Sequence, residues 1–305
     1  MRDVELKKYI VPGKVKADIT LIGDLHYTKG MEEGFLSQIV SEIKEDKSTV
    51  CFVGDILHEA NIIEDEQHRN IIRNFMKELA QKHNINIILG NHDVMSRKDD
   101  KWVEDKQAID FYETLAKEAK INFLDNTIQS NLNSRNTFVG VNPGFDFYEN
   151  ENKKEDKEKL LQKLKELKTI RKHIEDNLLP FYEQNNILLM HSPYLSDDKE
   201  IKKELKDYDL VLCGHMHNGC VPEIFDNKEG NKGIISPYND LLCDNARGYK
   251  VISDNSHLII TGGLTKIAGD SKLKRFLNGL FPVSIDKIAI REGVKELLSY
   301  KSHRR

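Results

Sequence analysis

Five short segments of the chain carry aspartate, asparagine and histidine, which are residue types that bind metal ions. Carboxylate and amide oxygens and imidazole nitrogens together suit divalent transition metals. Most of these segments follow a run of apolar, β-branched residues, so they are expected where buried strands end. The pattern is typical of a two-metal site on the ends of strands. The segments are Asp24-Leu25-His26, Gly54-Asp55, Gly90-Asn91-His92-Asp93, His191 and Gly214-His215-Met216-His217.

The spacing within the segments fits this chemistry. Asp55 follows a glycine, which lets the backbone approach a ligand closely, and its two oxygens can each coordinate one ion. Asn91 offers a neutral carbonyl oxygen, and His215 and His217 can direct their rings to neighbouring ions. Taken singly, each segment also reads as a helix cap, a turn or a buried histidine. All five in this order, each at a strand exit, favour the metal site over those plainer readings.

The first half of the chain alternates between strand and helix patterns. Strands are predicted at 15–22, 48–53 and 85–89, with helices at 35–43 and 70–83 between them. This rhythm predicts parallel strands in a layered α/β fold. The ligand segments then lie at the carboxyl ends of the strands, where open α/β sheets bind their ligands.

The second half is less regular. Lys and Glu dominate residues 149–176, but leucine and isoleucine recur at helical spacing, so the segment is predicted to be an amphipathic surface helix. One domain over residues 1–292 with a basic tail at 293–305 is the simplest organisation. The remaining predictions are a helix at 103–119 and strands at 121–124, 127–132, 137–141, 186–190, 209–213, 258–261 and 285–290.

Composition limits the classes of function. The chain has 305 residues and a net charge of −4, so no global basic field attracts nucleic acid. The four cysteines have no zinc-type spacing, and buried free thiols in a reducing compartment explain them best. No apolar stretch approaches the roughly 18 residues of a membrane span. We therefore expect a cytoplasmic protein without a transmembrane segment.

With these five segments, the chain resembles the calcineurin-like metallophosphoesterase superfamily from about residue 17 to 220. The resemblance implies a four-layer α/β/β/α sandwich of two mixed sheets, the metallophosphatase fold. It also implies two divalent metal ions, for which the nitrogen and oxygen ligands suit Mn2+ or Fe2+, with Zn2+ or Co2+ as alternatives. One metal would be held by Asp24, His26, Asp55 and His217. The other would be held by Asp55, Asn91, His191 and His215.

The same resemblance implies the reaction. A hydroxide bridging the two metals would attack the phosphorus of a phosphate mono- or diester. His92 would be the catalytic histidine near the leaving group, and Asp93 would orient it. A small phosphorylated molecule is the expected substrate.

Two other functions stay open. His58, three residues after Asp55, resembles the DNA-repair nuclease branch of the superfamily, which makes nucleic acid an alternative substrate. His58 is also interpretable as a hydrogen-bonding support for a metal ligand, and we favour that reading. A non-catalytic scaffold of the same fold is the third candidate, which the complete set of site residues opposes.

Overall fold

The computed structural model describes most of the chain. No helix among the described residues is long and apolar enough to cross a membrane. The described residues are 4–31, 33–43, 45–99, 101–149, 152–178, 183–221, 231–234, 236–238, 241–265, 283–294, 296 and 298–302.

The first large sheet has seven strands in the order β15-β1-β14-β2-β3-β4-β7. Its centre, β2 to β4, is parallel, as the alternating sequence pattern predicts. β14 runs antiparallel to β2, so the sheet is mixed. The strands are β1 (Glu5–Pro12), β2 (Ala17–Ile22), β3 (Thr49–Val53), β4 (Ile85–Ile88), β7 (Asn122–Phe123), β14 (Ser284–Arg291) and β15 (Leu298–Ser302).

The second large sheet has six strands in the order β12-β13-β11-β10-β9-β8. Its four middle strands are parallel and its two edge strands, β12 and β8, are antiparallel to their neighbours. The strands are β8 (Ile128–Asn131), β9 (Asn136–Val141), β10 (Asn185–Met190), β11 (Leu210–Cys213), β12 (Gly248–Ser253) and β13 (Ser256–Ile260).

Alternating side chains explain how the layers stack. On β3, Val50 and Phe52 pack against the helices outside the first sheet, while Cys51 and Val53 face the second sheet. On β10, Leu188 packs against the helices outside the second sheet, while Leu189 faces the first sheet. Every strand of this kind is buried on both faces, which is why its sequence is almost continuously apolar.

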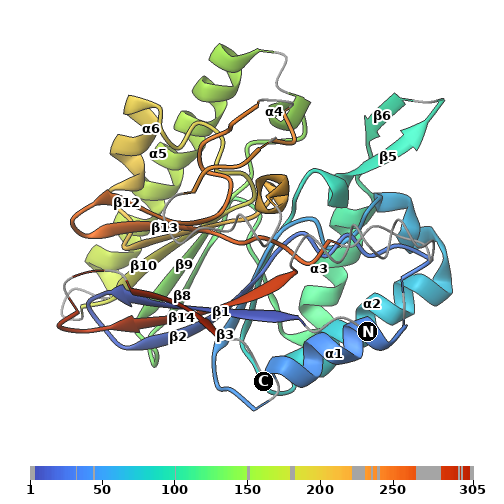
Figure 1. Cartoon of the computed structure of the whole chain (residues 1–305), viewed down its shortest axis with the longest axis horizontal. Helices are drawn as coiled ribbons and strands as arrows, with labels where there is room; N and C mark the ends of the chain where they lie inside the picture. Colours follow the sequence, from blue (N-terminus) through green and yellow to red (C-terminus); the bar gives the residue numbers. More distant parts are fainter. Residues whose placement is uncertain are drawn as a thin grey trace.

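Helices cover both outer faces and complete four layers, confirming the predicted α/β/β/α sandwich (Figure 1). On the first sheet lie α1 (Glu33–Ile43), α2 (Glu66–Ala80) and α3 (Gln107–Ala119). On the second lie α5 (Lys153–Leu178), the predicted amphipathic helix, and α6 (Lys199–Leu205). The short helix α4 (Asp146–Glu149) and the 3-10 turns η1 (Ala60–Glu64), η2 (His92–Val94) and η3 (His217–Cys220) lie in the connections.

Two predicted boundaries are wrong. The helix predicted from residue 103 begins at Gln107, because β5 (Met95–Lys98) and β6 (Lys101–Glu104) form a two-stranded ribbon instead. The segment predicted as a tail from residue 293 contains β15, which pairs antiparallel with β1. Its polar residues suit an edge strand, where only one neighbour contributes hydrogen bonds.

Candidate metal centre

The fold brings all five predicted segments to one place. They leave β2, β3, β4, β10 and β11, strands that run parallel within their sheets, so their carboxyl ends meet at one edge of the sandwich. The structure places the ligand atoms of Asp24, His26, Asp55 and His217 within 4.8 Å of one another. It does the same for Asp55, His191 and His215, and Asp55 belongs to both groups.

The backbone of these loops is strained in a way that marks a functional site. Asp24, His26 and Asp55 have φ angles of 49°, 45° and 54°, in the left-handed region that L-residues avoid. His215 and His217 have φ angles of 69° and 45°. Each such residue costs about 1 kcal/mol or more, so the surrounding fold must enforce this geometry.

Gly54 shows how tightly the loops approach. Its φ is 92°, and a Cβ atom at this position would lie 2.5 Å from Nδ1 of His191 and 2.6 Å from the backbone nitrogen of Gly90. Only glycine leaves room for the loops after β3, β4 and β10 to converge. The glycine in the Gly54-Asp55 segment is therefore a packing requirement of the site.

Asp55 is the centre of the arrangement. Its Oδ1 accepts a hydrogen bond from the backbone N–H of His92 at 2.9 Å. Its Oδ2 lies 3.3 Å from Nε2 of His26 and 3.2 Å from Nε2 of His191. His191 donates from Nδ1 to the carbonyl oxygen of Val53 at 2.7 Å, which turns Nε2 toward Asp55. Burial lowers the pKa of His191, but Asp55 outweighs it and raises the pKa to about 9, so a metal bound at Nε2 would displace a proton.

Several buried atoms here have no hydrogen-bond partner. They are Nε2 of His26, Oδ2 of Asp55, Oδ1 of Asn91 and Nε2 of His215. Buried polar atoms are normally paired, and leaving one unpaired costs about 1–3 kcal/mol. These unpaired atoms are nitrogen and oxygen ligand atoms from separate loops. The residues present therefore fit the divalent metals that the sequence implies.

Burial and neighbouring charges shift the pKa values of the site residues in different directions. Burial raises the pKa of Asp24 to about 7, although His191 opposes the shift. Burial acts on Asp55 too, but His191 and His92 hold its pKa well below the ordinary value. Burial lowers the pKa of His217 to about 3, so this ring is neutral at any physiological pH. A neutral imidazole beside carboxylates is the form that binds a cation.

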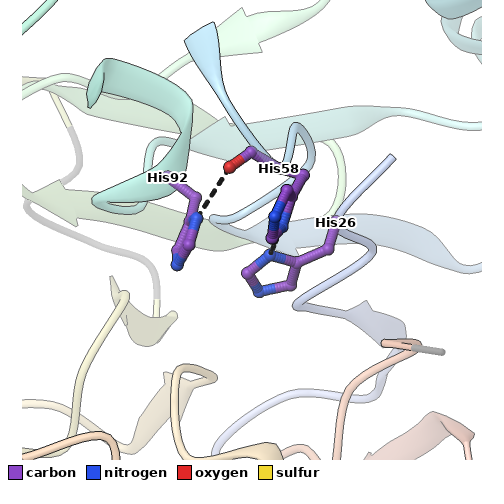
Figure 2. A group of neighbouring side chains, drawn as sticks. All are labelled: His26, His58 and His92. Carbon is purple, nitrogen blue, oxygen red and sulfur yellow. Dashed lines mark hydrogen bonds between the residues drawn. The ribbon is translucent and has the colours of Figure 1, made fainter. Parts of the chain in front are cut away.

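His58 links two of the site histidines (Figure 2). Its Nδ1 lies 3.3 Å from Nδ1 of His26, and its backbone oxygen lies 2.7 Å from Nδ1 of His92. His58 also stacks on the ring of His92, with centroids 5.3 Å apart. The contact with His26 supports the favoured interpretation of His58 as a hydrogen-bonding support for a ligand.

Asp93 is buried beside His92 and accepts three hydrogen bonds. Its Oδ1 accepts from the backbone N–H of Leu57 at 2.9 Å and from the hydroxyl of Tyr112 at 3.2 Å. Its Oδ2 accepts from the backbone N–H of Gly90 at 3.0 Å. Asp93 thus ties two loops together, and the carbonyl of His58 holds the His92 ring. These hydrogen bonds of Asp93 run to Leu57, Gly90 and Tyr112, and its role toward His92 stays a prediction.

Sequence reasoning missed Thr265. Its hydroxyl lies 3.0 Å from Nδ1 of His217 and donates to the carbonyl oxygen of Asp24 at 2.7 Å. Thr265 follows a Gly-Gly-Leu stretch after β13, and no motif marks it. The pairing of β13 with β11 and the hydrogen bond from the backbone N–H of Leu264 to the carbonyl oxygen of Asp24, at 3.2 Å, bring it to the site.

The protein is an α/β sandwich of two sheets. Aspartate and histidine side chains at the strand ends form a site that suits two metals. The sequence profile of the calcineurin-like phosphoesterases matches residues 17–219. The chain belongs to this family, whose members are generally metal-dependent phosphoesterases that bind two divalent metals. No curated protein sequence matches the chain.

Solved structures with similar folds are distant in sequence. Phosphopantetheinyl hydrolase from Mycobacterium tuberculosis is 12% identical, with a TM-score of 0.43 over 82% of this chain and 91% of that one. A dimetal phosphatase from Danio rerio is 12% identical, with a TM-score of 0.46 over 81% and 88%. A 5'-nucleotidase precursor from Thermus thermophilus is 12% identical, with a TM-score of 0.45 over 91% of this chain and 54% of that one.

Proposed function

We propose that the protein hydrolyses phosphate mono- or diesters with two divalent metal ions. The observation that carries the proposal is the position of Asp55, whose unpartnered Oδ2 lies between Nε2 of His26 and Nε2 of His191. A carboxylate shared by two ligand groups is the natural bridge between two ions. Asp24, His26 and His217 would complete one metal site. Asn91, His191 and His215 would complete the other.

The protein's own groups prepare this site. Two divalent ions held by these residues would supply a water molecule of lowered pKa and positive charge for the phosphate oxygens. The backbone N–H of His215 donates to both oxygens of Asp24, at 2.8 and 3.0 Å, and holds that carboxylate in position. Burial of the ligands excludes bulk water and strengthens each charge interaction.

His92 is the proposed acid for the leaving group. Its Nδ1 must donate to the carbonyl oxygen of His58, because a carbonyl only accepts. Nε2 therefore carries a proton only when the ring is cationic, which is the form that can protonate a departing alkoxide. The ring is half-buried beside the ligand His26, with centroids 4.4 Å apart, so it borders the metal centre.

The ligand chemistry indicates which metals the site would bind, and the cysteines indicate the cellular location of the protein. The nitrogen and oxygen ligands suit Mn2+ or Fe2+ best, and Zn2+ or Co2+ next. The described cysteines are all free thiols, and three of them are buried. They support the prediction of a cytoplasmic, reducing location.

Metal removal tests the proposal. Purified protein should hydrolyse bis-p-nitrophenyl phosphate or p-nitrophenyl phosphate, lose the activity in excess EDTA and regain it with Mn2+. The ratio of the two rates measures the preference for diesters or monoesters. Full activity in EDTA, with no metal by elemental analysis, would contradict the proposal.

A nuclease is the second candidate, because the sequence around His58 resembles the repair nucleases and His58 lies at the proposed metal centre, beside His26 and His92. Single-stranded DNA in the same assay separates the two candidates. A protein that binds two metals but hydrolyses none of these esters would instead be the non-catalytic scaffold.

A further inference from the structure

The single tryptophan of the chain lies beside the proposed acid. Trp102 is on strand β6, and its ring centroid is 6.1 Å from that of His92, with the planes at 70°. The side chain is 42% exposed, although tryptophan is among the residues that gain most from burial. A large aromatic surface is thus open to solvent next to the group that meets the leaving side of an ester.

The ribbon that carries Trp102 projects from the body of the molecule (Figure 1). Its base is fixed by buried hydrogen bonds. Ser96 donates to Asp105 at 2.8 Å and accepts from the backbone N–H of Asn61 at 3.1 Å, and the backbone N–H of Asp105 donates to the carbonyl oxygen of Val94 at 2.7 Å. His92 lies in η2, which leads directly into β5. The tryptophan and the histidine are therefore held on one connected unit.

The surroundings of Trp102 do not suit an apolar partner. Among the described residues of the ribbon, it is the one large apolar side chain that is exposed. Directly across the ribbon is Arg97, and Lys98 pairs with Lys101. A lone aromatic ring among charged side chains lacks the contiguous apolar area of a protein or lipid contact. It suits a small planar group that stacks on the ring.

We propose that Trp102 is a stacking platform for a nucleobase in the leaving group of the substrate. The proposal rests on the proposed phosphoesterase function and names the substrate class as nucleotides or the ends of single-stranded nucleic acid. Every base has a flat face, and stacking on an aromatic side chain contributes about 1–3 kcal/mol per base.

Paired substrates test the platform. Adenosine 5'-monophosphate and ribose 5-phosphate share a sugar and a phosphate, and only the first has a base. The wild-type protein with Mn2+ should favour the nucleotide in kcat/KM by roughly 5- to 150-fold, the range that 1–3 kcal/mol of stacking gives. Trp102→Ala should bring this ratio close to one, and Trp102→Phe should keep most of it. A ratio near one in the wild type, or one that Trp102→Ala leaves intact, overturns the proposal.

A second measurement uses the ring itself. Because Trp102 is the single tryptophan, quenching of intrinsic fluorescence reports contacts at this residue. Adenosine 5'-monophosphate or an oligodeoxynucleotide should quench it, while ribose 5-phosphate should not. Stronger quenching by the mononucleotide identifies a nucleotide as the source of the base, and stronger quenching by the oligomer identifies a nucleic acid end. No quenching by either contradicts the platform.

Two controls distinguish an error in the stacking proposal from an error in the proposed phosphoesterase function. Leu132 is 63% exposed at the β8–β9 turn, at the end of the second sheet opposite the metal centre, so Leu132→Ala should leave the substrate ratio as in the wild type. Hydrolysis of bis-p-nitrophenyl phosphate reports the proposed function without a nucleobase. If that activity is present and the nucleotide preference is absent, the platform alone is wrong. If that activity is absent with Mn2+, the proposed function fails first.

Discussion

The hydroxyl of Thr265 lies between Nδ1 of His217, at 3.0 Å, and the carbonyl oxygen of Asp24, at 2.7 Å. The carbonyl only accepts, so the hydroxyl gives its one proton to Asp24 and accepts from Nδ1–H of His217. The contact thereby fixes the His217 tautomer whose Nε2 is unprotonated. A residue beyond the matched family segment thus prepares a proposed ligand within it.

We expect Thr265→Val to weaken metal binding. The substitution keeps the shape of the side chain but removes the acceptor for His217, and loss of a hydrogen bond to a metal ligand typically costs roughly 10–100-fold in affinity. Competition with a chromogenic chelator for Mn2+ measures the change at one of the two proposed sites. Thr265→Ser keeps the hydroxyl and should bind like the wild type. Equal affinity in the valine variant would show that the contact is incidental.

Replacement of Asp55 should affect both metals. Asp55→Asn keeps the shape but removes the charge that the two ligand groups share, so metal content should fall toward one or none per chain. His26 belongs to only one of the two proposed ligand sets, so His26→Ala should leave the other metal site better occupied. Elemental analysis after dialysis measures both variants. Two metals per chain in Asp55→Asn would withdraw the bridging assignment.

His92 should be needed for turnover and not for metal binding. His92→Ala is expected to keep both metals while losing roughly 10²–10⁴-fold in kcat, the usual contribution of a positioned acid. The loss should be smaller with p-nitrophenyl phosphate, whose leaving group departs without a proton, than with an alkyl phosphate. Steady-state kinetics on the two esters, with metal content as the control, decides this. An emptied metal site would make His92 a ligand.

The pH dependence of stability should carry a signature of Asp286. Burial between the sheets raises its pKa to about 6 from the ordinary 3.8, although Lys7 and Thr261 oppose the shift. The folded state therefore holds this proton more tightly than the unfolded chain. The stability that the proton provides is present below about pH 4 and is lost as the pH rises through about 6.

Asp286→Asn cannot lose that proton. Relative to the wild type, its free energy of unfolding should rise as the pH goes from 4 to 7, by about 3 kcal/mol at most for a shift of roughly two units. Denaturant unfolding of both proteins at several pH values measures the difference. Asp254→Asn, at an exposed turn between β12 and β13, is the matched control and should show no such trend. A pH-independent difference for Asp286→Asn would refute the shift.

The sequence predicts most of the site because its determinants are local. A buried strand followed by Gly54-Asp55 or Gly214-His215 announces both the element and the ligand at its end, and parallel pairing then brings such ends together. The sandwich follows from the same apolar strands once the family resemblance is recognised. The described structure confirms both layers of sheet and both layers of helix.

What the sequence could not predict depends on contacts between distant residues. Asp93 follows His92 in the chain, yet its carboxylate accepts hydrogen bonds from Leu57 and Tyr112, which lie 36 and 19 positions away. Thr265 meets His217 across 48 positions. The β5–β6 ribbon escapes detection because its polar residues have neither a strand period nor a turn motif, and the tertiary base at Ser96 and Asp105 holds it.

The order of strands in the first sheet has a consequence for synthesis on the ribosome. β1 and β2 are consecutive in the chain, but β14 lies between them in the sheet. β2, which positions Asp24, therefore has an unpaired edge until residues 286–290 of β14 have been made. Unpaired strand edges are sites of aggregation. The nascent chain must therefore keep this edge of β2 protected until β14 has been made and can pair with it.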